Sequence, residues 1–177
     1  MKSTENIRLA CITIRQQATH NQQAPEELSL LLPHANVITV ELTSSIEDKS
    51  IDGTTSTSLT ARNMLWPVVC FTPDLKITHN ISSKLCSQGY RFAVCINPTN
   101  PRYRFALTCD QVTSIQCDPK ALLQLPTIMH TQQSPIMGTF YNDDAIHCVT
   151  DADHLVKFLQ QHLNNIPRTE DLSCELH

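Results

Sequence analysis

Residues 62–71 read Arg-Asn-Met-Leu-Trp-Pro-Val-Val-Cys-Phe, and residues 105–115 read Phe-Ala-Leu-Thr-Cys-Asp-Gln-Val-Thr-Ser-Ile. Both segments are short and rich in β-branched and aromatic side chains, which predicts β-strands. Pro67 has no backbone N–H to donate, so we expect the first strand to lie at a sheet edge or to bend at a bulge. The two segments therefore indicate a mainly β protein.

Similar short apolar runs occur along the rest of the chain. Strands are predicted at residues 7–14, on both sides of Pro33 within 28–42, at 90–96, at 103–115, and in a closing hairpin of 134–141 and 145–149. The polar stretch 43–60 is predicted to be a loop, and a short helix is expected around 81–86. Many short strands separated by turns are typical of a barrel or a sandwich.

One amphipathic helix follows the last hairpin. Thr150 and Asp153 have the spacing of a capping box, in which both side chains satisfy free backbone amides at a helix start. Apolar residues then recur every three or four positions and Pro167 ends the pattern; they are Leu155, Phe158, Leu159, His162, Leu163 and Ile166. No linker is visible, so we interpret residues 1–177 as a single domain, with 168–177 as a flexible tail.

The composition narrows the class of protein. Of 177 residues, 41% are hydrophobic and 17% charged, and the formal net charge is −4. An acidic chain with scattered Lys and Arg argues against nucleic-acid binding. No apolar run reaches the roughly 18–20 residues that span a bilayer, and the first residues lack the apolar core of a signal peptide. We therefore expect a cytoplasmic protein without membrane insertion.

The eight cysteines are interpreted as buried thiols of the core. Five lie in predicted strands: Cys11, Cys70, Cys95, Cys109 and Cys148. No Cys-x-x-Cys pair is present, so neither a metal nor a cofactor is predicted, and disulfides are not expected in a reducing cytoplasm.

Catalysis is not predicted either. His147 or His130 could in principle join Cys109 or Cys117 as a nucleophile pair, but no sequence signature brings them together. Alternation along the strand predicts that His147 faces solvent while Cys148 points inward. Only three glycines are present, which excludes Gly-rich phosphate loops.

The two opening segments resemble the signature strands of CheW-like domains, adaptors that couple bacterial chemoreceptors to a histidine kinase. One family strand reads roughly Leu-Arg-Gly followed closely by Pro-Val-Ile-Asp-Leu, and the other reads roughly Phe-Gly-Leu-hydrophobic-Val-Asp-x-Val. Arg62 and Pro67 match the first pattern, and Asp110 and Val112 match the second. An earlier family segment, apolar-Pro-Leu and then Val-x-Glu-Val, is similar to residues 32–40.

The resemblance implies two interleaved, SH3-like, five-stranded β-barrels with a C-terminal helix. It also implies a non-enzymatic adaptor, in which one subdomain docks on the regulatory domain of a histidine kinase. The groove between the subdomains would take the tip of a helical hairpin from a chemoreceptor-type protein, because an amphipathic helix can lay its apolar face into such a groove.

The resemblance also suggests site residues, each with an alternative role. Arg62 could clamp a partner's carboxylate or bond to loop carbonyls of its own domain. Val37 and Val40 could line the receptor groove or belong to the core. Trp66 could anchor an interface or pack inside. Asp110 and Pro67 are predicted to be structural.

Three residues depart from the family pattern. Thr39, Asn63 and Cys70 stand where the family has Glu, Gly and Asp, and we expect these changes to affect the binding surface more than the fold. The Trp-Pro-Val junction suggests a branch that serves type IV pilus chemosensory systems. Two other functions stay open: a degenerate tether or oligomerisation module with weak self-association and no kinase coupling, and a thiol or zinc protein.

Overall fold

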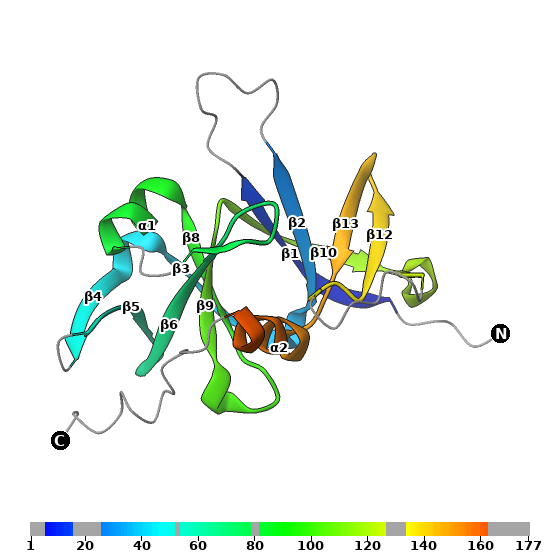
Figure 1. Ribbon diagram of the computed structural model, residues 1–177. Helices are drawn as coiled ribbons and strands as arrows, with labels where there is room; N and C mark the ends of the chain where they lie inside the picture. The colour runs from blue at the N-terminus through cyan, green and yellow to red at the C-terminus, as the bar shows by residue number, and fades with distance from the viewer. Residues whose placement is uncertain (1–5, 16–25, 52–53, 79–81, 127–133, 163–177) are drawn as a thin grey trace.

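The computed structural model describes residues 6–15, 26–51, 54–78, 82–126 and 134–162, which form two β-sheets and helices (Figure 1). The first sheet has the strand order β10-β1-β2-β13-β12-β11. Its strands are β1 (Ile7–Arg15), β2 (Glu27–Pro33), β10 (Gln111–Cys117), β11 (Leu123–Gln124), β12 (Gly138–Asn142) and β13 (Ala145–Val149).

The second sheet comes from the middle of the chain. Its strand order is β3-β8-β9-β6-β5-β4, and β7 pairs with β6. These strands are β3 (Val37–Leu42), β4 (Ile46–Ile51), β5 (Thr54–Ala61), β6 (Met64–Phe71), β7 (Ile77–Thr78), β8 (Phe92–Ile96) and β9 (Phe105–Cys109). The helices are α1 (Ser83–Gly89) and α2 (Ala152–His162), with 3-10 turns η1 (His34–Asn36), η2 (Thr43–Ser45), η3 (Pro101–Tyr103) and η4 (Pro119–Ala121).

The chain enters the second sheet after β2 and returns to the first at β10, so the second sheet is inserted between strands of the first. Parallel pairings of β13 with β2 and of β6 with β9 join strands that are distant in sequence. The prediction of a mainly β fold with a C-terminal helix is confirmed. Within the described part of the chain, each sheet has more than the five strands expected.

A central core lies between the two sheets and is covered by α2 (Figure 1). The helix contributes Leu155 and Leu159, both fully buried, and Phe158, whose ring meets Phe71 of β6 edge-on at 5.9 Å between centroids. The apolar face that the three- and four-residue spacing predicts for this helix therefore packs into the core. Burial of these apolar side chains is the main force that holds the two sheets together.

Each sheet also has a smaller core of its own. The second-sheet core contains Ile46, Leu59, Ala61, Trp66, Cys70, Cys86, Ala93, Cys95 and Ala106. The first-sheet core contains Leu9, Cys11, Leu31, Cys117 and Phe140. The five strand cysteines lie in strands as predicted, and all but the half-buried Cys148 are buried.

The expectation of a loop over residues 43–60 is wrong, because β4 and β5 form a hairpin there. Ile46 and Leu59 are directly opposite in its register and both are buried. The remaining positions are mostly Ser, Thr and charged residues, and the buried apolar side chains of the described hairpin are Ile46 on β4 and Leu59 and Ala61 on β5. Threonine fits a pleated, half-exposed surface well, which explains why so polar a segment is extended.

The predicted strand 103–115 is in fact two strands in different sheets. It divides at Asp110, between β9 of the second sheet and β10 of the first. The backbone N–H of Asp110 donates to the Thr13 carbonyl at 2.9 Å, and a carboxylate oxygen of Asp110 accepts from Arg15 N at 2.7 Å. Asp110 therefore bonds the crossover to β1.

The expected edge position of Pro67 is wrong, since β6 has neighbours on both sides. The register with β5 ends at Ser58 opposite Pro67, and the parallel register with β9 begins at Val68 opposite Ala106. Pro67 thus lies where β6 changes from one ladder to the next. A residue without an N–H disturbs neither ladder at that point.

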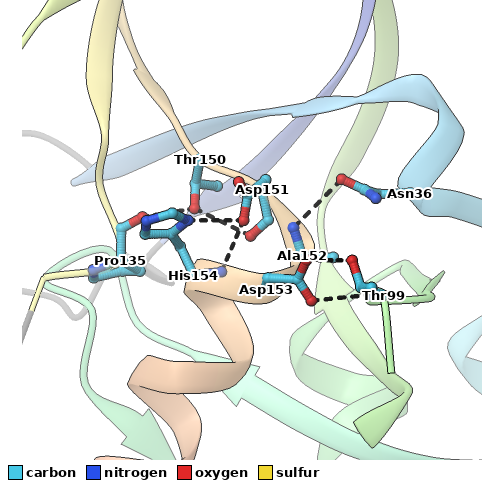
Figure 2. Close-up of polar contacts among 8 residues, drawn as sticks. All are labelled: Asn36, Thr99, Pro135, Thr150, Asp151, Ala152, Asp153 and His154. Carbon is cyan, nitrogen blue, oxygen red and sulfur yellow. Dashed lines mark hydrogen bonds and ion pairs between the residues drawn. The ribbon is translucent and has the colours of Figure 1, made fainter. Parts of the chain in front are cut away.

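The cap of α2 differs from the predicted capping box. Asp151 is the capping residue: its Oδ1 accepts from His154 N at 2.8 Å (Figure 2). The Thr150 hydroxyl instead donates to the Pro135 carbonyl at 2.6 Å. The Asp151 carboxylate, one residue after the predicted capping residue Thr150, reaches a free amide of the first turn, so the predicted cap was one position too early.

Asp153 connects the helix to the second sheet rather than capping it. Its two carboxylate oxygens accept from Thr99 N at 3.0 Å and from the Thr99 hydroxyl at 2.6 Å (Figure 2). Ala152 N also donates to the side chain of Asn36 at 3.4 Å. The start of α2 is therefore bonded to the turn before β3 and to the connection between β8 and β9, two segments that flank strands of the second sheet. Leu163, Ile166, Pro167 and the predicted tail 168–177 lie outside the described residues.

Candidate protein-binding surface

Arg62 lies at the tip of the β5–β6 hairpin, exposed to solvent. Ala61 and Met64 form the last pair of the ladder, so the turn consists of Arg62 and Asn63 alone. Both have positive φ, 50° and 58°, as a two-residue type I′ turn requires. Among the residues that the structure describes, the Arg62 guanidinium has no hydrogen-bond or ion-pair partner. The alternative of a bond to loop carbonyls thus has no support, and partner binding stays a prediction.

Strand β3, which belongs to the same sheet as this hairpin, presents an exposed apolar pair. It is the last strand on its side of the sheet and pairs with β8. Val40 and Leu42 are 39% and 54% exposed. They lie opposite Val94 and Phe92 in the register, whose side chains belong to the central core. Because opposite residues share a face, the apolar pair extends that face beyond the core.

Val37 and Val40, which were predicted together, are separated by the structure. Val37 is half-buried and packs against the central core, which is its alternative role. The register of β3 shifts between Val37 and Thr39, at a bulge or irregularity that turns the following side chains. Leu42 was missed, although alternation from Val40 would have indicated it.

The opposite face of β3 is polar. The Thr39 hydroxyl donates to a carboxylate oxygen of Glu41 at 2.9 Å. The pKa of the Cys95 thiol is raised to about 12, chiefly by burial and further by Glu41, whereas Arg62 acts to lower it. Glu41 and Arg62 therefore act in opposite directions on the pKa of one buried thiol of the second-sheet core.

Trp66 is fully buried in the second-sheet core, which is the packing alternative predicted for it. Its Nε1–H donates to the carbonyl of Ala61 at 3.1 Å, directly before the turn. The Arg104 guanidinium lies 5.8 Å from the ring centroid and donates through Nε to the Leu65 carbonyl at 3.2 Å. Together these contacts hold the stem of the hairpin that presents Arg62.

The three departures from the family pattern fall in different places. Asn63 is exposed in the turn and Thr39 is half-buried beside Glu41. Cys70 is only 2% exposed and belongs to the second-sheet core. The expectation that Cys70 alters the binding surface is therefore wrong, since its side chain does not reach the surface.

The histidine–cysteine contact in the structure differs from the nucleophile pairs that were considered from the sequence. His147 Nδ1 lies 3.9 Å from Cys11 Sγ, and its ring stacks on Phe140. His147 is half-buried rather than facing solvent, because both faces of β13 are partly covered. His130 lies outside the described residues. Within the described ranges, no group of three or more His, Cys, Asp or Glu residues could hold a metal ion.

Comparison with solved structures identifies the class of fold. The chain is similar to the crystal structure of scaffolding protein TtCheW from Thermoanaerobacter tengcongensis, with a TM-score of 0.52 and 13% identity over 82% of this chain and 88% of that one. Neither the protein-family models nor the curated protein sequences give a match. The protein therefore has a CheW-like fold, as the resemblance predicted. None of the described helices is long and apolar enough to cross a membrane.

Proposed function

We propose that this protein is a non-enzymatic adaptor of chemosensory signalling that couples a chemoreceptor-type protein to the regulatory domain of a histidine kinase in the cytoplasm. The observation that carries the proposal is the exposed Arg62 guanidinium, which has no hydrogen-bond or ion-pair partner among the described residues and lies in a strained turn of a fold shared with a scaffolding protein. A type IV pilus system is one setting for such an adaptor.

Arg62 and β3 offer two kinds of contact. A planar guanidinium can bind a partner's carboxylate through two parallel hydrogen bonds. Val40 and Leu42 offer apolar area that the hydrophobic face of a helix could cover. Signal transfer in this proposal is geometric: each partner is held by one surface, so a rearrangement of the receptor shifts the kinase.

The substitution at Thr39 is compatible with this role. Glu41 places a carboxylate within hydrogen-bond distance of Thr39, so an acidic group stays on the polar face of β3. The substitution at Cys70 lies in the core and leaves the surface unchanged.

The test is a pull-down with three forms of the full chain: wild type, Arg62→Glu, and Lys120→Glu as a control with the same charge change on the exposed η4 turn. Captured proteins are identified by mass spectrometry, and circular dichroism confirms that each variant is folded. We expect a histidine kinase or a chemoreceptor with the wild type and with Lys120→Glu, and its loss with Arg62→Glu. Equal recovery with all three would place the binding site elsewhere, and recovery of neither protein would overturn the proposal.

A specific observation also favours the second function, self-association. Tyr141 and Ile146 lie opposite each other at the end of the β12–β13 hairpin and are 60% and 69% exposed. Sedimentation equilibrium of the wild type and of Ile146→Asp tests this tether or oligomerisation role. A monomer at all concentrations would exclude it, and a dimer lost in the variant would support it.

A further inference from the structure

Two cysteines from different elements meet in the second-sheet core. Cys70 lies on β6 and Cys86 on α1, and their Sγ atoms are 3.7 Å apart. Both are free thiols, 2% and 0% exposed. In the part of the chain that the structure describes, no other two cysteine sulfurs are in contact. A disulfide has an Sγ–Sγ distance of about 2.05 Å, so the sulfurs need to approach by about 1.6 Å.

The helix that carries Cys86 is weakly attached. It has seven residues, and Cys86 is its buried residue. Ser82 caps it through a 3.4 Å bond from Leu85 N, and Asp48 of β4 accepts from Ser83 N and from the Ser83 hydroxyl. Helices this short are marginal without packing. Local opening of α1 would therefore expose Cys86 to a small reagent while the sheet stays folded.

We infer that Cys70 and Cys86 are a site of oxidative modification, at which hydrogen peroxide converts the two thiols into a reversible disulfide. One sulfur attacks a peroxide oxygen as its thiolate, giving a sulfenic acid and releasing one water after proton transfer. The second sulfur then displaces the sulfenic hydroxyl as water and forms the S–S bond. Overall, two thiols lose two electrons and two protons, and one peroxide is reduced to two waters.

The hydrogen bond between the two thiols also affects their pKa values. The bond from Cys86 lowers the pKa of Cys70, against the effect of burial, while the same bond raises the pKa of Cys86. The thiolate is the reacting form of either sulfur.

The inference does not rest on the proposed function. The new bond would fasten α1 to β6, and through Asp48 it would also limit the separation of α1 from the β4–β5 hairpin. It would thus stiffen the core that supports the Arg62 turn.

The test treats the folded, full-length protein with hydrogen peroxide, alkylates the remaining thiols and maps tryptic peptides. Cleavage after Arg62, Lys76, Lys84 and Arg91 puts the two cysteines in separate peptides, 63–76 and 85–91. We expect these peptides to be joined in most molecules, with the mass of two hydrogen atoms lost and with separation by a reducing agent. The link should be absent in Cys70→Ser and in Cys86→Ser, and present in Cys95→Ala, a control from the same core.

Recovery of Cys70 and Cys86 from the treated wild type as separate thiols or sulfinic acids would overturn the inference. So would a link that appears only after denaturation. The wild-type map decides the question by itself if a serine variant fails to fold, which circular dichroism would reveal.

Discussion

Arg62 and Asn63 form the whole of the β5–β6 turn, and both hold positive φ angles, 50° and 58°. Asp143 and Asp144 do the same in the β12–β13 hairpin of the other sheet, at 49° and 61°. Asp and Asn tolerate this region, whereas a long side chain such as Arg enters it at a cost of about 1–2 kcal/mol. Strain of this kind is common at functional positions, and here it occurs at an exposed arginine that has no ion-pair partner in the described part of the chain.

The turn makes a prediction about stability. Replacing Asn63 by Gly should raise the free energy of unfolding by up to about 1 kcal/mol, because Gly at the second position is the preferred chemistry of a type I′ turn. Urea denaturation measures the difference. The control is Asn100→Gly, at a φ of −94°, where the side chain accepts from Arg102 N. That change should lower stability, and a gain at Asn100 equal to that at Asn63 would contradict the explanation.

The apolar pair on β3 makes a prediction about binding. Leu42→Lys should change the free energy of unfolding by less than about 1 kcal/mol, because the side chain is already exposed. It should weaken binding to the partner captured by the wild type at least tenfold, since burial of a Leu side chain is worth about 1.5–3 kcal/mol. Titration calorimetry gives the affinity. Ile146→Lys, a change at another exposed apolar residue on the first sheet, should leave that affinity unchanged if β3 is the docking surface.

The single tryptophan allows the second-sheet core to be tested by substitution and by fluorescence. Trp66→Phe removes the donor to the Ala61 carbonyl and leaves a small cavity, which should lower the free energy of unfolding by about 2 kcal/mol. In the wild type, Trp66 fluorescence should be poorly quenched by acrylamide and should shift to the red on unfolding, because the ring is buried. Strong quenching of the folded protein would contradict the burial.

Local patterns in the sequence were sufficient for β1, β6 and the apolar face of α2, because each buries several regularly spaced side chains. They failed for the β4–β5 hairpin, in which Ile46 and Leu59 form the one buried apolar pair of the described ladder. The division at Asp110 was hidden because both strands read as one extended run, and the break depends on bonds to residues of β1 that lie far away in the sequence.

The candidate site shows the same limit. Arg62 was predicted as a site residue because it lies in a short motif, whereas the contacts that hold its hairpin come from separate elements. The pairing of Cys11 with His147 and of Cys70 with Cys86 likewise depends on which strands and helices become neighbours, and no local spacing in the sequence indicates it.

The bond between Asp153 and Thr99 predicts how stability depends on pH. Hydrogen bonds from the Thr99 hydroxyl and then its N–H hold the pKa of Asp153 below the usual 3.8. This carboxylate therefore contributes its full stabilisation above the pKa of the unfolded chain and loses it as the pH falls through the lower, folded pKa. The contribution should be less than about 1 kcal/mol, because the group is poorly buried. Asp153→Asn should thus reduce the loss of stability between neutral and acidic pH, measured by urea denaturation across that range.

Part of the acid dependence should remain, because the pKa values of Asp48 and Asp74 are also lowered, the first by bonds from Ser83 and the second by Lys76. The matched control is Glu47→Gln, at an exposed position of β4. If stability falls with pH as steeply in Asp153→Asn as in this control, the bond to Thr99 contributes nothing to the acid dependence.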